Sequence, residues 1–403
     1  MPRTLINGSA GDDVSYLQEK LNSLPPTLLP PLVIDGDFGA QTQARVEEYQ
    51  NNNGLTADGN VGPFTWTKLL KHATTKSPGF FVLGRNLYDR LGAKVLLRGV
   101  NKMCVFDRFA DPKGLTSFSE IKQTGANTVR IVWAITTDLQ PNGPATSTAT
   151  LDELISNAIA NRLIPMIELH DATGDWGRLG ELVDYWTQPS VVTIIEMHAQ
   201  HLLVNIGNEV GDDTVSQEDF VKGYTDAIQR MRAAGIHTPL VIDASDFGKN
   251  LIMLNDTAAT LLAADPEYNI VFSVHLYWSI SCGADEAFIR SNLQQAVDLD
   301  YPLVVGEFSQ FGGFPCGSPP GTSMCSEGGK IDYQTILSAC HGHGIGWCAW
   351  EWGPGNDFND PLCAVMDMTP DRLFANLKPG FAREVALDSP FSIKNTSVTP
   401  ASI

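Results

Sequence analysis

The chain has 403 residues, of which 43% are hydrophobic and 18% charged, a composition that excludes global disorder and suits a packed core. Its length exceeds one ordinary domain and is enough for a full barrel with a small additional module. The formal net charge of -19 argues against a nucleic-acid partner, because phosphate backbones attract clustered Lys and Arg. The sequence shows neither a membrane span nor a signal peptide, since the start at Met1 lacks a basic segment followed by an apolar one.

The first 72 residues predict a compact helical module. Asp12-Asp13 precedes a helical pattern of apolar residues from Val14 to Leu24, and the proline-rich residues 25–31 end this helix. Two Asp-Gly turns follow, and each is succeeded by a small residue, an N-cap and a helix. Glycine supplies the turn geometry, while Leu and Val residues fill a small core.

This module resembles the bacterial peptidoglycan-binding module of three helices. The resemblance is carried by Asp35-Gly36-Asp37-Phe38-Gly39, Tyr49-Gln50, Gly54-Leu55, Asp58-Gly59, Val61-Gly62-Pro63, Thr65-Trp66 and Leu69. It implies that the module binds bacterial cell-wall glycan. A spacer and a binder of another polysaccharide are alternatives, because one fold can carry several functions. The insertion PPTLLPP also departs from the usual short connection.

After a polar linker at residues 73–80, apolar strands alternate with helices. The hairpin FFVLGRNLYDRLGAKVLL is expected to cover the floor of a barrel. Strands buried on both faces and joined by amphipathic crossovers such as DELISNAIANR predict an α/β fold, the (β/α)8 TIM barrel, over residues 81–383. Residues 384–403 are expected to form a C-terminal tail. The eight predicted strands are Val95–Val100, Thr128–Trp133, Ile164–Leu169, Leu202–Asn208, Leu240–Ala244, Ile270–Tyr277, Leu303–Phe308 and Gly346–Trp350.

Seven cysteines are an odd number, so at least one is unpaired within a single chain, and their spacing matches no zinc pattern. Cys316 and Cys325 flank a Gly/Pro/Ser loop, and we predict a disulfide that closes it. Cys104 and Cys363 follow the first and last strands, which are neighbours in a closed barrel, and are a candidate second pair. Cys348 lies inside a strand and is expected to be a buried thiol.

Two glutamates end predicted strands on opposite sides of the barrel. Glu209 follows the fourth strand in the sequence IGNE, and Glu307 ends the seventh in VGEF. Side chains at the C-terminal ends of barrel strands line the active site, so these two carboxyl groups should face each other. Retaining glycosidases use two carboxyl groups about 5 to 5.5 Å apart, one as nucleophile and one as acid/base. The alternative is a pair of surface residues in rim salt bridges.

From about residue 81 to 380 the chain resembles glycoside hydrolase family 5, and most closely its bacterial β-mannanases. The resemblance is carried by LRGVN (97–101), GANTVRIVW (125–133), IELHDATGDW (167–176), VDYW (183–186), LVNIGNE (203–209), HLYW (275–278), VVGEF (304–308) and GWCAWEW (346–352). It places the family's active-site residues, all at strand ends, at Arg130, His170, Asn208, Glu209, His275, Tyr277, Glu307 and Trp350.

Chemical roles follow for this set. Arg130 and Tyr277 can donate hydrogen bonds to Glu307, the expected nucleophile, and are expected to keep its pKa low. Asn208 suits the 2-hydroxyl of the reacting sugar. His275 can support Glu209, the expected acid/base, and His170 can bind sugar hydroxyls; either histidine alone is more often a structural residue.

Aromatic side chains supply the flat faces that pyranose rings stack on. We expect Trp350 beneath the reacting sugar. Neighbouring sugars could stack on Trp133, Trp176, Trp278 and Trp352, and some of these are alternatively core residues. After the fifth strand, Asp246-Phe247 stands where the mannanases usually carry Asn-Trp, which puts one distal sugar contact in doubt.

The sequence therefore predicts a secreted retaining endo-β-1,4-mannanase that needs no metal or organic cofactor. An endo-β-1,4-glucanase of the same family is the first alternative, because the two sugars differ at one hydroxyl. A non-catalytic cell-wall-binding protein is an alternative from another class. Transfer of the sugar to an acceptor other than water would use the same residues.

Overall fold

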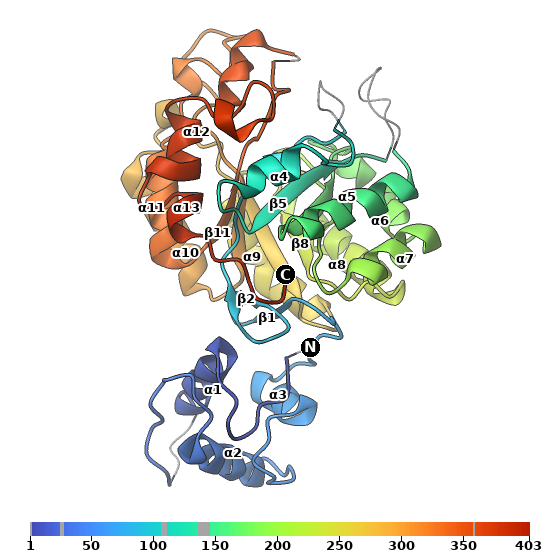
Figure 1. The fold of residues 1–403 in the computed structure, drawn as a ribbon, viewed down its shortest axis with the longest axis vertical. Coiled ribbons are helices and arrows are strands. Elements are labelled where there is room, and N and C mark those ends of the chain that lie inside the picture. The colour runs from blue at the N-terminus through green and yellow to red at the C-terminus, as the bar shows by residue number, and fades with distance from the viewer. Residues whose placement is uncertain (1, 25–27, 106–110, 136–145, 358) are drawn as a thin grey trace.

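The structure is a computed structural model that describes residues 2–24, 28–105, 111–135, 146–357 and 359–403 (Figure 1). Eight parallel strands close into a barrel in the order β10-β11-β4-β5-β6-β7-β8-β9, which confirms the predicted (β/α)8 fold. These strands are β4 (Arg98–Lys102), β5 (Thr128–Trp133), β6 (Ile164–Leu169), β7 (Leu203–Asn205), β8 (Leu240–Asp243), β9 (Ile270–His275), β10 (Leu303–Glu307) and β11 (Gly346–Ala349).

Helices surround the barrel and cover the outer face of its strands (Figure 1). In α8, the Ser216 side chain accepts a hydrogen bond from the backbone N–H of Asp219 at the N-terminus, and Arg230 and Arg232 occupy the last turn. The apolar stripe of α8 is buried through Phe220 and Ile228. The outer helices are α4 (Ser117–Lys122), α5 (Thr148–Ala160), α6 (Leu179–Trp186), α7 (Pro189–His198), α8 (Gln217–Ala233), α9 (Leu251–Ala264), α10 (Glu286–Asp298) and α11 (Tyr333–His343), with the short α12 (Phe381–Arg383) and α13 (Ile393–Thr396) near the C-terminus.

A small antiparallel sheet of β1 (Phe81–Leu83), β2 (Asn86–Tyr88) and β3 (Lys94–Val95) closes the barrel floor, as the hairpin predicted. Its inward side chains join the interior of the barrel strands in one apolar cluster, with Phe80, Val82, Leu87, Val95 and Leu97 against Ile164, Met166, Leu203, Val241, Val271 and Val304. The C-terminal segment also packs here, because Ser402 donates a hydrogen bond to Asp89 at 2.7 Å. The floor is therefore sealed, and the opposite end of the barrel is left for chemistry.

The N-terminal module contains α1 (Asp12–Asn22), α2 (Ala40–Asn52) and α3 (Pro63–Leu70). The internal repeat seen in the sequence has a structural counterpart in two glutamines. The side-chain oxygen of Gln18 accepts from the N–H of Gly36 and that of Gln50 from the N–H of Gly59, both at 3.0 Å. Both glycines have φ near +70°, a conformation that favours glycine.

The module packs directly on the barrel floor (Figure 1). Phe81, Leu83 and Tyr88 of the floor sheet belong to the same apolar cluster as the module's Leu17 and Trp66. Polar contacts add to this: the ring of His72 stacks on Tyr268 at 3.7 Å, and Thr75 donates to Glu267 at 2.9 Å. The module and the barrel share a core instead of being separated by a free linker.

Two disulfides differ from the predicted pairing. Cys282 bonds to Cys316 and Cys325 to Cys363, so the predicted Cys316–Cys325 bridge is wrong and so is a Cys104–Cys363 bridge. In a closed barrel the loops after consecutive strands lie side by side, and both bonds join such loops, after β9 and β10 and after β10 and β11. The remaining Cys104, Cys340 and Cys348 are buried outside both disulfides, as predicted for Cys348.

Within the described residues, no helix is both long and apolar enough to cross a membrane.

Candidate active site

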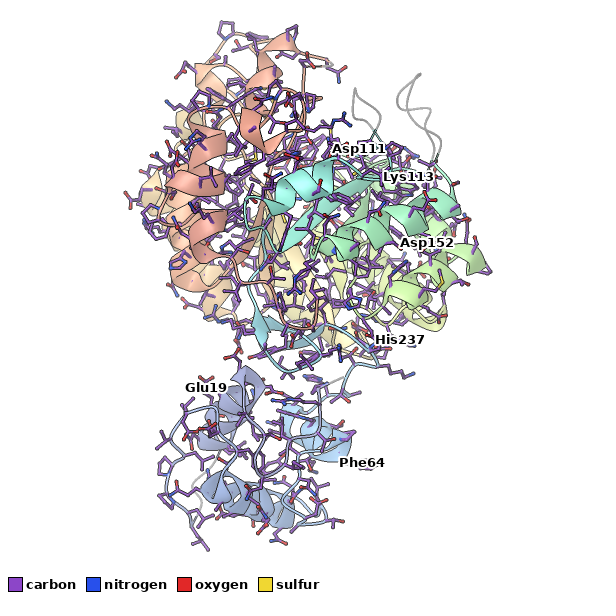
Figure 2. The ribbon with its side chains drawn as sticks, viewed as in Figure 1. Glu19, Phe64, Asp111, Lys113, Asp152 and His237 are labelled. Carbon is purple, nitrogen blue, oxygen red and sulfur yellow. A yellow bond between two sulfur atoms is a disulfide. The ribbon has the colours of Figure 1, made fainter. Side chains whose placement is uncertain are left out.

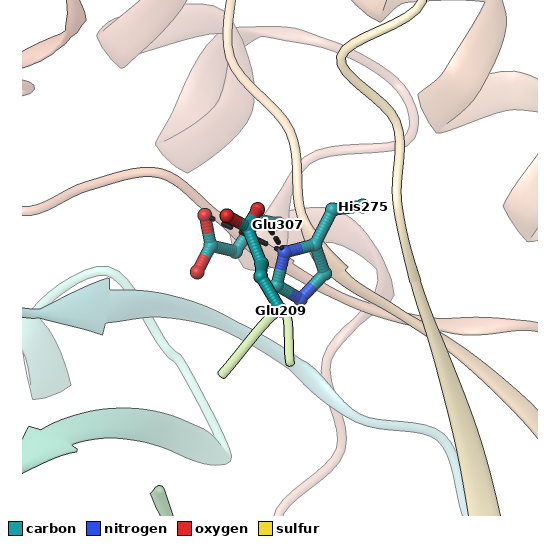
Figure 3. A group of neighbouring side chains, drawn as sticks. All are labelled: Glu209, His275 and Glu307. Atoms are coloured by element: carbon teal, nitrogen blue, oxygen red, sulfur yellow. Dashed lines mark hydrogen bonds and ion pairs between the residues drawn. The ribbon is translucent and has the colours of Figure 1, made fainter. Parts of the chain in front are cut away.

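Glu209 and Glu307 face each other across the open end of the barrel (Figure 3). Glu307 is the last residue of β10, and Glu209 follows β7 in a left-handed backbone conformation with φ of 49°. The N–H of Glu209 donates to Asp243, and its carbonyl accepts from the N–H of Gly174. Carboxylate oxygens of the two glutamates lie within 4.8 Å of each other. This separation suits direct attack by one carboxylate while the other transfers a proton.

Glu307 is held by one donor on each oxygen. Arg130 donates to its Oε1 at 2.7 Å, and the Tyr277 hydroxyl donates to its Oε2 at 2.8 Å. Burial raises the pKa of Glu307, and the charges of His275 and Arg130 oppose that rise without cancelling it. The prediction that the donors keep this pKa low is therefore wrong, because desolvation of the carboxylate outweighs them.

The Tyr277 hydroxyl keeps its proton at all ordinary pH values. Burial, with the nearby carboxylate charges of Glu307 and Glu209, raises its pKa well above the usual range. It therefore acts only as a donor to Glu307, which is the role the sequence predicted.

Glu209 contacts His275, whose Nδ1 lies 2.7 Å from its Oε1 (Figure 3). Burial by itself lowers the pKa of His275, but the charges of Glu307 and Asp243 and the hydrogen bond to Glu209 outweigh it, so the pKa is raised. A protonated imidazole here can donate its Nδ1 hydrogen to the Glu209 carboxyl group.

His170 forms a second cationic position in the site. Desolvation lowers the pKa of His170, but Glu168 reverses this through its charge and a 2.9 Å hydrogen bond, and raises the pKa to about 9. Asn208 lies beside it, with its Oδ1 2.8 Å from Arg130 Nη2 and its Nδ2 donating to Thr173 at 3.0 Å. The structure thus brings His170 and Asn208 to the pocket as the sequence predicted.

Trp350 forms one wall of the pocket and stacks near His170, with ring centroids 6.0 Å apart. Its indole Nε1 donates to Asn356 at 2.7 Å, and the Asn356 amide donates to Asp367, also at 2.7 Å. These bonds fix the plane of the indole ring at the position expected beneath a sugar.

The other tryptophans are not gathered around the carboxylates. Trp133 and Trp352 are fully buried, so the prediction that sugars stack on them is wrong. Trp133 donates to the hydroxyl of Tyr185, and Trp352 donates to the carbonyl of Arg372. Trp176 packs on Phe220 and Tyr224 and lies outside the pocket lining. These rings pack in the core between the barrel and its helices. The sequence pattern alone does not distinguish a tryptophan in the core from one that lines a binding cleft.

The pocket above Glu209 and Glu307 has a volume of about 440 Å³. The β10 loop, fixed by both disulfides, contributes Gly312, Phe314 and Met324 to its lining. A second hollow of about 420 Å³ adjoins it and contains Trp278, half-buried, and Phe288. Lys249, Tyr277 and Phe314 line both hollows, so the two hollows form one continuous cleft.

The loop after β8, which carries Asp246-Phe247 where the mannanases usually carry Asn-Trp, lies in this cleft. Phe247 lines the first hollow and Asp246 the second, and Lys249 Nζ lies 3.4 Å from Asp246 Oδ1. An aromatic face and a charged pair thus stand where the sequence placed the doubtful sugar contact.

Two buried acids in the site were missed by the sequence reading. Glu168 on β6 holds His170, and Asp243 at the end of β8 contacts four partners of the network. Both acids lie in the C-terminal half of a strand, next to apolar residues in the sequences IEL and VID. A single acid in such an apolar segment was the sequence pattern that could have identified them. A charged residue in a buried strand is expensive unless it is paired.

A carboxylate pair with an imidazole could also be considered as a cation site, since the ligand atoms of Glu209, His275 and Glu307 lie within 4.8 Å of one another. However, both oxygens of Glu307 already accept hydrogen bonds from Arg130 and Tyr277. A cation would have to compete with the guanidinium charge. The arrangement suits proton transfer and nucleophilic attack better than metal binding.

Comparisons with known proteins identify the families of the barrel and of the N-terminal module. Residues 88–356 match the family model described as cellulase (glycosyl hydrolase family 5), and residues 10–69 match that of a putative peptidoglycan binding domain. A mannan endo-1,4-beta-mannosidase from Salipaludibacillus agaradhaerens is 32% identical over 276 residues, which cover 68% of this chain and 81% of that protein.

A solved structure supports the same assignment. The β-mannanase from Streptomyces thermolilacinus, determined with mannohexaose, superposes with a TM-score of 0.66 at 29% identity, covering 80% of this chain and 97% of that one. The N-terminal module is similar to part of a zinc D-Ala-D-Ala carboxypeptidase from Streptomyces albus G, with 44% identity over 66 residues, 16% of this chain and 26% of that protein.

Proposed function

The chain belongs to glycosyl hydrolase family 5 and is a glycoside hydrolase, and from this premise we propose that it cleaves β-1,4-mannan internally with retention of configuration. The observation that carries the mechanism is the carboxylate pair, with oxygens within 4.8 Å, one side of which is anchored by Arg130 and Tyr277. A separation of this size leaves no room for the water that an inverting enzyme places between its carboxyl groups.

In the first step Glu307 attacks the anomeric carbon, and the bond from that carbon to the leaving oxygen breaks. Glu209 donates its proton to the leaving oxygen and becomes a carboxylate. Arg130 and Tyr277 hold the Glu307 carboxylate in the orientation needed for attack. The entropic cost of orienting the nucleophile in the transition state is therefore small. Trp350 supports the apolar face of the reacting sugar, and Asn208 binds its 2-hydroxyl.

In the second step a water molecule attacks the same carbon and releases Glu307. Glu209 takes a proton from that water, which restores the starting state. The imidazole of His275, 2.7 Å from Glu209, stabilises the carboxylate that exists between the two steps. A sugar hydroxyl can replace water here, so transfer to an acceptor is a side reaction of the same residues.

The choice of mannan rests on the named relatives. The mannanase relative is matched at 32% identity, whereas the endoglucanase of Thermobifida fusca superposes at 19% identity and therefore supports only the fold. Initial rates on mannan, galactomannan, glucomannan and carboxymethyl-cellulose test the proposal. Hydrolysis of the cellulose derivative without hydrolysis of mannan would contradict it and favour the glucanase alternative.

Replacement of the nucleophile tests catalysis against a purely binding role. E307A should abolish mannan hydrolysis, because Glu307 lies opposite Glu209 in the pocket and supplies the attacking oxygen in the proposed mechanism. Retention of hydrolysis by a folded E307A protein would refute the assignment. Proton NMR of early products provides the second test, since a retaining enzyme releases the β-anomer first.

We also propose that the N-terminal module binds cell-wall glycan and that the protein acts outside the cytoplasm. The module has a hollow of about 840 Å³ lined by apolar Leu24, Tyr49 and Leu55 and bordered by Lys68 and Lys71. Phe64 at its edge is 85% exposed (Figure 2). Two disulfides are consistent with an oxidising compartment.

The module is tested in the full chain, because its core includes Phe81 and Tyr88 and a deletion would expose them. Y49A and F64A are compared with the unaltered protein in pull-downs on insoluble cell walls and on insoluble mannan. We expect weaker retention on walls with unchanged hydrolysis of soluble mannan. Unchanged retention on walls would refute the assignment of this hollow.

A further inference from the structure

Asp243 is a buried acid that the eight-residue set from the sequence did not include. It ends β8, is fully buried, and lies between Arg130, Glu209 and His275. We infer that Asp243 is a positioning residue for the acid/base step, acting on Glu209 through His275 and through the Glu209 backbone. This inference rests on the proposed two-step mechanism.

The contacts of Asp243 are divided between its two oxygens. Oδ1 accepts from the Asn205 amide at 3.1 Å, which orients the carboxylate. Oδ2 accepts from Arg130 Nη2 at 3.2 Å and from the backbone N–H of Glu209 at 3.1 Å. The second of these bonds fixes the left-handed residue that carries the acid/base carboxyl group. Loss of Asp243 would therefore free the backbone of Glu209 directly.

The third partner of Oδ2 is His275, whose Nε2 lies 3.4 Å away. The other ring nitrogen, Nδ1, lies 2.7 Å from Glu209 Oε1. Asp243, His275 and Glu209 thus form a carboxylate–imidazole–carboxylate series. The charged groups that face His275 are Glu209 after β7, Asp243 on β8 and Glu307 on β10, and three acids around one ring favour its protonated form.

A protonated ring in this position serves the interval between the two steps. After Glu209 has given its proton to the leaving oxygen, it must remain a carboxylate until water arrives. The imidazolium donates to that carboxylate from Nδ1, and Asp243 balances the positive charge from the Nε2 side. The Asp243 carboxylate also offsets the positive charge of Arg130. The site can therefore contain two positively charged side chains, Arg130 and protonated His275, without displacing Glu307.

The test compares D243N with the unaltered protein on two substrates. One is mannan, whose leaving group needs a proton, and the other is a dinitrophenyl β-mannobioside, whose leaving group does not. We expect kcat/KM on mannan to fall by about 10- to 100-fold, the scale of a partial loss of acid–base catalysis. On the dinitrophenyl substrate kcat/KM should fall less, because its leaving group needs no proton. Its kcat should fall as well and should be relieved by azide, which attacks the glycosyl-enzyme without a base.

NMR titration of His275 gives a readout that a merely structural role would not move. In the unaltered protein its pKa should lie above the ordinary value, in D243N it should fall, and D243E should restore it in part. An unchanged His275 pKa in D243N, or equal losses on both substrates without azide relief, would overturn the proposal. Should D243N fail to fold, a His275 pKa at or below the ordinary value in the unaltered protein would overturn it as well.

D265N is the matched control. Asp265 is equally buried and ion-paired, to Arg232 at 2.8 Å, but it lies away from the cleft. It should lower the midpoint of thermal unfolding without moving the ratio of the two substrates. If the protein cleaved glucan and not mannan, only the proposed substrate would be wrong. The role inferred for Asp243 would then be tested by the same comparison of D243N with the unaltered protein on the corresponding glucosides.

Discussion

Replacing Tyr277 with phenylalanine removes one of the two donors that hold Glu307 and leaves the ring in place. The lost bond is 2.8 Å long and ends on a carboxylate, and hydrogen bonds to charged groups contribute about 1.5 to 3 kcal/mol. The Arg130 bond to the other oxygen remains, so the carboxylate keeps its stronger partner. We therefore expect kcat/KM on mannan to fall by about 10- to 100-fold, using about 1.4 kcal/mol per factor of ten.

The pH profile should move in the same variant. Glu307 must be ionised to attack, and burial already raises its pKa, so activity should be lost as the pH falls through a value above that of an ordinary glutamate. Without the Tyr277 donor the ionised form is less stabilised, and the acid limb of kcat/KM should move to still higher pH. Initial rates on soluble galactomannan across the acid range measure both effects.

Y301F provides the control for this experiment. Tyr301 is also buried and also donates a hydrogen bond, to Asn255 at 2.7 Å, but it lies outside the cleft. It should lower the free energy of unfolding by about 1 kcal/mol and leave the pH profile in place. If Y277F retained the kcat/KM and the acid limb of the unaltered protein, our account of how Glu307 is held would be refuted.

Three further predictions concern the rest of the cleft. The double variant C325S/C363S should lower the free energy of unfolding by about 2 to 4 kcal/mol in denaturant titrations. It should also raise KM for mannan, because Met324 in the β10 loop lines the pocket and that loop loses one of its two disulfides. An unchanged KM would show that the loop keeps its position without this disulfide. W350A should lower kcat/KM on mannan by about tenfold or more. W133F should lower the free energy of unfolding by about 1 to 3 kcal/mol with KM unchanged, because Trp133 is buried and loses both its bond to Tyr185 and part of its packing; a raised KM in W133F would contradict its place in the core. Dialysis against a chelator should leave the rate on mannan unchanged, since the proposed steps use protein side chains and water without a metal ion; a loss reversed by one particular metal ion would argue against these steps.

Local pattern was sufficient for the barrel and for the central carboxylate pair. Strands such as Thr128–Trp133 are buried throughout and mostly apolar because both faces of the strand are covered, and this pattern can be recognised from consecutive residues. Since all parallel strands end at one rim, the polar residues that follow them, including Glu209 and Glu307, must gather there. That argument needs no knowledge of which strand lies beside which.

Long-range packing decided what local pattern could not. The disulfides follow the closing of the barrel, which places the loop containing Cys316 beside the loop containing Cys282. Cys316 therefore pairs with Cys282 and not with Cys325, the cysteine nearest to it in sequence. The sequence does not distinguish a tryptophan that is fully enclosed in the core, such as Trp133, from one that lines the pocket, such as Trp350.

Electrostatics in the site depended on the tertiary structure in the same way. The donors to Glu307 were visible in the sequence, but the net direction of its pKa was not, because desolvation is a property of the whole enclosure. Asp243 has partners on β5, β7 and β9, and only the closed barrel brings them within reach of one carboxylate. The sequence by itself determined the fold and pointed to Glu209 and Glu307 as the proposed reacting pair, while the tertiary structure decided which groups hold these two carboxyl groups in place.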